Sequence, residues 1–327
     1  MRVQRIIVVL LMLGWLFHCG PEKPDQVPES EVPYTSLKTL EEVKSDLSSD
    51  VWSTRSTAIL AAIDGNHREV IPTLYELFKS DEHAAVRQTA ALALADFGEK
   101  AAAPLIAARL KNPNGENPTF LLDALTRLGV ASTAPIVVEY LGHENHSVRL
   151  QAVRALEIMK ATAMGPRILA QVQSLKDPDP DVQRAYIMAL GKVHYAGAGA
   201  YLLQLAKQLD SGPNLAATYL ALGRVDYHPA TPELIAALDR EFVKGRENAL
   251  QATLEIADPR APALAFPLIK NERRDSRFAA AEIIATIPDP SLNDKLLSLL
   301  DGESDIAVAP AAYALGRRKL AVARVPI

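Results

Sequence analysis

The single thiol of the chain lies where a covalent modification would suit it. Cys19 is the only cysteine among 327 residues, so no disulfide can form within the chain. It follows a twelve-residue apolar run, residues 6–17, which is preceded by Arg2 and Arg5. A membrane-spanning helix needs about 20 apolar residues, whereas a basic start and a shorter apolar run are typical of an export signal. Residues 1–18 are therefore predicted to be an export signal peptide.

The segment around Cys19 resembles a bacterial lipoprotein signal, whose lipobox ends in the cysteine that receives the lipid. Leu16 fits the third position before the cysteine, while Phe17 and His18 depart from the small residues that the family has there. The resemblance implies lipidation of Cys19 and a place in the bacterial cell envelope. Gly20, where inner-membrane lipoproteins carry Asp, favours the outer membrane, facing the periplasm. A plain signal peptide and an uncleaved membrane anchor are the alternatives.

Residues 19–35 are predicted to form a lipid-anchored tether. The part from Pro21 to Tyr34, PEKPDQVPESEVPY, holds four prolines and several carboxylates, and it lacks a helical period. Such a composition gives an extended, semi-rigid segment. At about 3.1 Å per residue, the tether would hold the following domain, residues 36–327, up to roughly 40 Å from the membrane.

Other residue types that could do chemistry lack the spacing that the chemistry needs. His143 and His146 lie in a turn-like segment with no Cys or carboxylate at zinc spacing. The acidic run from Asp177 to Asp181 lacks the Gly and the distal Glu of a calcium loop, and helix capping by Asp179 or Asp181 explains it. The sequence has no nucleophile elbow and no Gly-rich phosphate loop. We therefore expect no metal, no cofactor and no catalytic residue, and hence a protein that is not an enzyme.

Tyrosines gather in one part of the chain, which indicates either packing or a contact surface. Five of the nine tyrosines lie between residues 186 and 227: Tyr186, Tyr195, Tyr201, Tyr219 and Tyr227. Tyr is enriched in interface hot spots, but bulky rings also fill gaps between helices. Tyr186 and Tyr219 fall at helix positions that are expected to be buried. Tyr195 and Tyr227 fall in turns, and they are the candidate partner-binding residues.

A repeated pair of helical patterns organises residues 36–327. In the stretch 81–110 an apolar helix starts near Val86, Gly98 breaks it, and Pro104 lies in the first turn of the next helix. The proline recurs at Pro72, Pro104, Pro135, Pro166, Pro232 and Pro262. The spacing of about 31 residues predicts an all-α domain, an α-solenoid (superhelix) of about nine antiparallel helix pairs, whose first helix is capped by Ser36.

This period and its polar residues resemble HEAT repeats of the short, phycobilisome-lyase type. In that family a Pro lies early in the first helix, an Asp lies in the turn within the repeat, and Val-Arg opens the second helix. Asp81, Val86 and Arg87 match the whole pattern. The arginine position is also held by Arg55, Arg149 and Arg277. Units three, six, seven and nine are expected to lack the polar pair.

The resemblance also implies roles for these residues and for the protein. The Asp and Arg are expected to form a hydrogen-bond ladder between turns, which serves packing. The protein is expected to be a scaffold that mediates protein–protein interaction. The alternative is an enzyme or lyase subunit built on the same fold, such as a phycobilin-lyase-like protein.

The distribution of charge favours a protein or peptide partner and excludes nucleic acid. The formal net charge is −4, and phosphate binding needs clustered Lys and Arg. The one basic cluster, residues 317–324, is expected to cap the last helix. By resemblance to the family, the second helices should line the concave side, where one position is filled in turn by Leu60, Leu92, Asp123, Arg154, Met188, Leu220, Ala252, Glu282 and Tyr313. This mixed row suits a specific protein partner.

Removal of the thiol tests the anchor. Acyl chains contribute about 0.8 kcal/mol per buried CH₂, so two or more chains give stable membrane attachment. We expect Cys19→Ser to release the protein from the membrane fraction or to leave an unprocessed precursor, as measured by fractionation and immunoblotting. Failure of a palmitate analogue to label the wild-type chain would remove the lipidation hypothesis.

Overall fold

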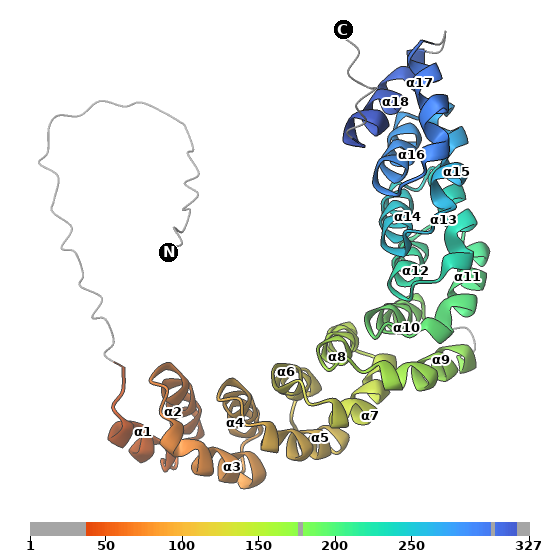
Figure 1. The fold of residues 1–327 in the computed structure, drawn as a ribbon. Coiled ribbons are helices and arrows are strands. Elements are labelled where there is room, and N and C mark those ends of the chain that lie inside the picture. Colours follow the sequence, from red (N-terminus) through yellow and green to blue (C-terminus); the bar gives the residue numbers. More distant parts are fainter. Residues whose placement is uncertain (1–36, 176–178, 302–304, 319–327) are drawn as a thin grey trace, which may run out of the picture. The chain divides into compact units, whose positions relative to one another are not determined.

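The computed structural model describes residues 37–175, 179–301 and 305–318. The compact unit that begins at Lys38 consists, within these ranges, of helices without a strand. Its α-helices form nine consecutive pairs, here called units one to nine, and they alternate between an outer and an inner row (Figure 1). The predicted all-α solenoid is confirmed.

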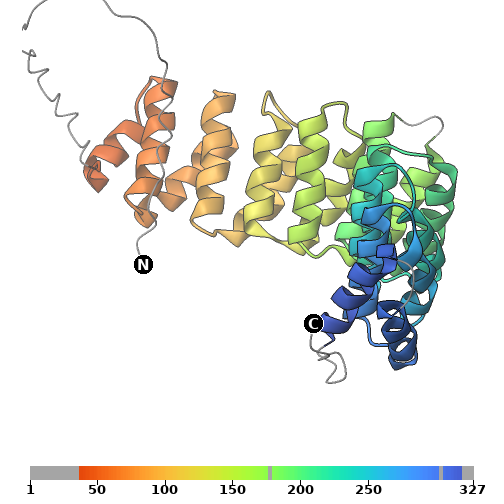
Figure 2. The same ribbon diagram turned by 90° about the horizontal axis from the view of Figure 1, so that it is seen from above.

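The first helix of each unit lies in the outer row and the second in the inner row (Figures 1 and 2). The outer row comprises α1 (Leu40–Leu47), α3 (Ile71–Ser80), α5 (Ala103–Lys111), α7 (Ala134–Val137), α9 (Gly165–Ser174), α11 (Gly199–Gln208), α13 (Thr231–Ala237), α15 (Ala261–Ala265) and α17 (Asn293–Leu300). The inner row comprises α2 (Trp52–Asp64), α4 (Ala84–Asp96), α6 (Pro118–Leu128), α8 (His146–Ile158), α10 (Pro180–Lys192), α12 (Pro213–Arg224), α14 (Val243–Ile256), α16 (Arg274–Thr286) and α18 (Asp305–Arg317). Short 3₁₀ helices flank the outer row at Arg68–Val70, Lys100–Ala102, Ala131–Thr133, Val138–Gly142, Thr162–Met164, Ala196–Ala198, His228–Ala230, Phe266–Lys270 and Pro290–Leu292. Across the described ranges, no helix is both long enough and apolar enough to cross a membrane.

The recurring prolines open outer helices, as the sequence predicts. Each of the six lies in the first turn of α3, α5, α7, α9, α13 or α15. A proline is tolerated there because its missing N–H would have no partner within the helix, and its fixed φ already suits the helix. In α11 the corresponding residue is Ala200.

A residue in the left-handed conformation ends seven inner helices, and the sequence indicates it only where that residue is Gly. The residue with positive φ is Asn66, Gly98, Gly129, Lys160, His194, Asp226 or Ala257. After Gly98, the N–H of Glu99 donates to the carbonyl of Leu94 at 2.9 Å, and after His194, the N–H of Tyr195 donates to the carbonyl of Leu190 at 3.2 Å. These bonds satisfy the last carbonyls of the helix and reverse the chain toward the next outer helix.

Small residues set how closely neighbouring helices approach. Ala90, Ala91 and Ala93 are fully buried in α4, as the repeat predicts. Gly191 and Gly223 lie inside helices rather than in turns. A Cβ on Gly191 would lie 3.0 Å from the Cα of Ala221, and one on Gly223 would lie 2.7 Å from the Cα of Ala252. Both glycines therefore allow close contact between α10, α12 and α14.

The first helix begins later than the sequence indicates. Thr39, not Ser36, is the N-cap of α1; its side chain accepts from the N–H of Glu42, and the Glu42 carboxylate accepts from the N–H of Thr39. This reciprocal pair satisfies two N–H groups at once. Ser36 lies outside the described residues, and Leu37 is exposed.

Truncation of a core leucine tests the stacking of the units. Leu94 in α4 is fully buried, whereas Leu60 in α2 is 53% exposed. We expect Leu94→Ala to lower the free energy of unfolding by about 2–5 kcal/mol, because it leaves a cavity. Leu60→Ala is the control, with an expected loss below about 0.5 kcal/mol. Equal losses for the two variants in denaturant titrations would contradict this packing.

Candidate functional site

An arginine closes the turn between the two helices of five units, and it is buried in four of them. Nη1 of Arg87 donates to the carbonyls of Asp81 at 2.6 Å and Glu82 at 3.1 Å, which lie six and five residues earlier. The same pair of bonds recurs at Arg55, Arg149, Arg246 and Arg277. The recurring arginine therefore holds the backbone of its own turn, and the predicted packing role is confirmed.

The arginine also reaches the turn of the next unit. Arg55 forms an ion pair with Asp81 at 2.7 Å, and Arg87 forms one with the fully buried carboxylate of Glu116 at 2.5 Å. Burial is the largest influence on Asp81 and alone would raise its pKa. The hydrogen bonds from Arg55 and from the N–H of His83, together with the charges of Arg55 and Arg87, outweigh it, so the pKa is lowered. These bonds tie the turns of units one and two to the turns that follow them, as the predicted ladder requires.

Two parts of the ladder differ from the sequence-based prediction. Unit seven does carry the arginine, Arg246, which the sequence pattern conceals because Gly245 takes the place of the preceding Val. In unit three the acidic partner is Glu116, in the connection after α5 and not at the expected position. In both cases the hydrogen bonds of the ladder are present, although the residues of the sequence motif are not.

The exposed face of the inner row is mixed, as predicted, with one correction. In the predicted row of residues along the inner helices, Ala252 stands for unit seven. Ala252 is fully buried against Gly223, and the exposed residue at this place is its neighbour Gln251. Large apolar side chains are exposed on several of these helices, including Leu60, Phe120, Leu150, Ile158 and Val243. The inner row therefore offers apolar side chains among charged ones.

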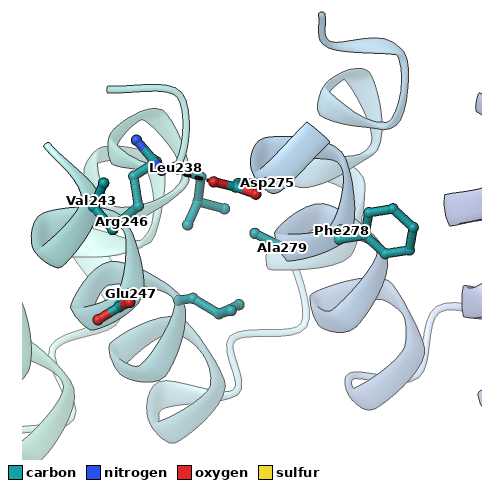
Figure 3. Close-up of a pocket in the computed structure, with 8 residues that line it drawn as sticks. Leu238, Val243, Arg246, Glu247, Asp275, Phe278 and Ala279 are labelled. Atoms are coloured by element: carbon teal, nitrogen blue, oxygen red, sulfur yellow. Dashed lines mark hydrogen bonds and ion pairs between the residues drawn. The ribbon is translucent and has the colours of Figure 1, made fainter. Parts of the chain in front are cut away.

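The inner helices part at one joint, between α14 and α16 (Figure 3). α14 contacts α12 far more extensively than it contacts α16. A hollow of about 400 Å³ lies between them, with the buried Leu238 in its lining and Val243, Leu250 and Ala279 at its sides. Val243 is 56% exposed. The hollow could receive an apolar side chain of a partner.

One ion pair spans this hollow. Nη2 of Arg246 lies 3.0 Å from Oδ2 of Asp275, which joins α14 to α16 (Figure 3). The arginine side chain is 9% exposed and the aspartate 71%. Because the aspartate is solvated, the pair contributes little to stability, and most of the effect of Arg246 lies in its bonds to the carbonyls of Arg240 and Glu241.

Four of the five clustered tyrosines differ in burial in the way that the sequence predicts. Tyr186 and Tyr219 are buried in α10 and α12. Tyr195 and Tyr227 are half-buried in the turns after those helices. Their rings lie where a Cβ on Gly165 or Gly199 would be, at 2.1 Å in each case. The two rings thus cover glycines at the starts of α9 and α11, and their contact with a partner stays a prediction.

The remaining sequence candidates have structural roles where the structure describes them. Asp179 caps α10 by accepting from the N–H groups of Asp181 and Val182, at 2.7 and 3.3 Å, so the capping interpretation is confirmed. Nδ1 of His143 accepts from the N–H of Asn145 at 3.0 Å. Within the described ranges no three His, Cys, Asp or Glu side chains converge as metal ligands would. Cys19 lies outside the described residues.

Two residues of the C-terminal basic cluster bond to α16 and to the start of α17, so their role goes beyond capping the last helix. Arg318 donates to the carbonyls of Ile284 at 2.8 Å and Asp289 at 3.1 Å, and to Oδ1 of Asn293 at 2.8 Å. Arg317 lies 3.3 Å from a carboxylate oxygen of Glu282. The other basic residues of this cluster lie outside the described ranges.

Comparisons with known proteins identify the repeat. A family model described as HEAT repeats matches residues 39–118 and 168–255. An engineered protein of known structure is 17% identical, with 86% of this chain and 88% of that chain covered and a TM-score of 0.51. The complex of CpcE and CpcF of phycocyanin lyase from Nostoc sp. PCC7120 is 18% identical, with 90% and 100% covered and a TM-score of 0.35. Kap121p is 14% identical, with 85% and 33% covered and a TM-score of 0.42. No curated protein matches.

Separate substitutions of the two partners test what the ion pair at the hollow contributes. Arg246→Met leaves the carbonyls of Arg240 and Glu241 without their donor, and we expect a loss of about 2–4 kcal/mol in the free energy of unfolding. Asp275→Asn removes only a solvated partner, with an expected loss below about 1 kcal/mol. A larger loss for Asp275→Asn in denaturant titrations would show that the ion pair dominates.

Alkaline pH tests the burial of Tyr219. Burial raises the pKa of Tyr219 to about 12 from its ordinary value of 10.0. Its stabilising contribution is therefore complete below pH 10 and is lost as the pH rises from about 10 to 12, by about 1.4 kcal/mol at pH 11. We expect the stability difference between wild type and Tyr219→Phe, from urea titrations, to be constant up to pH 9 and then to shift in favour of the variant. No shift by pH 11 would mean that the ring is solvated.

Proposed function

This chain belongs to the HEAT-repeat family, and we propose that it is a scaffold that binds another protein on its inner helix row. We further propose that it works in a bacterial cell envelope, exported and held at the outer membrane by a lipid on Cys19. The scaffold role follows from the repeat architecture, in which stacked units present a long surface. The location follows from the N-terminal sequence.

The observation that carries the binding role is the hollow between α14 and α16. Elsewhere, as between α10, α12 and α14, close packing fills the joint between inner helices. At this joint the apolar side chains of Val243, Leu250 and Ala279 border an open space of about 400 Å³. Interface anchors are side chains that fill such pockets, surrounded by a polar rim. Arg246, Glu247 and Asp275 supply charged groups beside it.

The proposed location is supported by residues that precede the solenoid. The basic start, the apolar run and the cysteine have the order of a lipoprotein signal. The Pro-rich residues 19–35 would then separate the solenoid from the membrane surface. Such a tether would hold the solenoid on the periplasmic side of the membrane, where a partner protein could reach it.

Photo-crosslinking tests which row meets the partner. A photoreactive amino acid at Ile158 or Val243 samples the inner row, and one at Leu105 or Leu264 samples the outer row with apolar residues of 40% exposure. In the cells that produce the protein, we expect both inner positions to capture the same protein and the outer positions to capture none. Equal capture from the outer row would contradict a binding site on the inner helices.

A further inference from the structure

Three consecutive inner helices carry an excess of basic residues. α8, α10 and α12 each contain one more Arg or Lys than Asp or Glu, whereas these charges balance in each of the other six inner helices. The chain as a whole is acidic, with a net charge of −4. The excess is therefore a local feature of units four to six.

Basic and apolar side chains alternate along the solvent-facing side of these helices. α8 presents Leu150, Arg154 and Ile158 at intervals of four residues, so they share one face. α10 presents Arg184, Met188 and Lys192 at the same intervals, and α12 presents Leu220 and Arg224. Leu150 is 40% and Ile158 is 52% exposed. We call these eight residues the basic–apolar face.

The basic–apolar face is continuous, and part of its charge is unneutralised. Lys192 of α10 forms an ion pair with Glu157 of α8 at 2.6 Å, which joins the two helices, and Arg184 pairs with Asp181 at 2.5 Å. Among the described residues, neither Arg154 nor Arg224 forms an ion pair. Two guanidinium groups are thus available to a partner, beside exposed apolar side chains.

We infer that the basic–apolar face binds a protein segment that carries carboxylates next to apolar side chains. This inference rests on the proposed function and specifies the chemistry of the partner. Arg pairs with carboxylates through two parallel hydrogen bonds, and Leu150, Ile158 and Met188 would bury the apolar side chains between them. A nucleic acid suits this face less well, because it needs clustered cations without carboxylates among them.

Charge reversal within the full chain tests the inference. The probe is a fluorescent 15-residue peptide of Glu and Leu with a central Pro, compared with versions that carry Lys for Glu or Ser for Leu, and with a 15-nucleotide oligo(dT). Arg154→Glu with Arg224→Glu removes the available cations. The matched control is Lys111→Glu with Lys207→Glu, which makes the same charge change at exposed residues of the outer helices α5 and α11.

We expect the Glu–Leu peptide to bind, and the double reversal to weaken it at least tenfold while the control changes it less than twofold. Binding should also weaken as salt rises. Equal binding of the Ser version or of oligo(dT) would overturn the inference in favour of a general anion site. Unchanged binding after the double reversal would also overturn it.

Two further measurements distinguish a variant that fails to fold, a wrong assignment of the basic–apolar face, and a wrong scaffold function. Melting curves show whether the double reversal folds, and Arg154→Gln with Arg224→Gln repeats the test if it does not. Photo-crosslinking from Val243 in the double-reversal variant probes the inner row away from this face. Retained partner capture there, together with unchanged peptide binding, would reject the basic–apolar face and leave the proposed scaffold function intact.

Discussion

The arginine that closes the turn in five units is the interaction that best defines how those units stack. A helix pair of this size cannot bury its own apolar face, so it needs a neighbour in a defined register. The arginine satisfies two carbonyls of its own turn and, at Arg55, Arg87 and Arg246, also bonds to an acidic side chain of the next turn. One side chain therefore shapes a unit and positions the following one.

The spacing of the inner helices is then set by side-chain size. Where Gly191 and Gly223 face the backbones of the next helices, α10, α12 and α14 pack closely. Between α14 and α16 the helices separate, and Arg246 and Asp275 span the gap. A repeat that is regular at its turns can thus vary along its inner face. The variation in spacing supplies the hollow, and the residue types of α8, α10 and α12 supply the basic–apolar face.

The tyrosines show that one residue type serves different purposes within one repeat. Tyr219 is fully buried inside α12, where an alanine suffices at corresponding places in α4. Tyr195 and Tyr227 cover glycines at the starts of the outer helices, and each keeps part of its ring exposed. A ring held in place by such packing loses little side-chain freedom on contact with a partner, which is a property of interface anchors.

The nine helix pairs, the prolines that open six outer helices and the arginine that closes several turns could all be predicted from the order of the residues. This is possible because these features depend on local backbone geometry: a ring that fixes φ, and a side chain that reaches carbonyls five and six residues earlier. Which residues face each other between neighbouring units could be seen only in the folded molecule. The pairs Arg246–Asp275 and Arg87–Glu116, and the opening between α14 and α16, depend on distances between units. The same holds for the exposure of Gln251 in place of Ala252. Those distances follow from the packing of residues about 30 apart in the chain, and no local pattern encodes them.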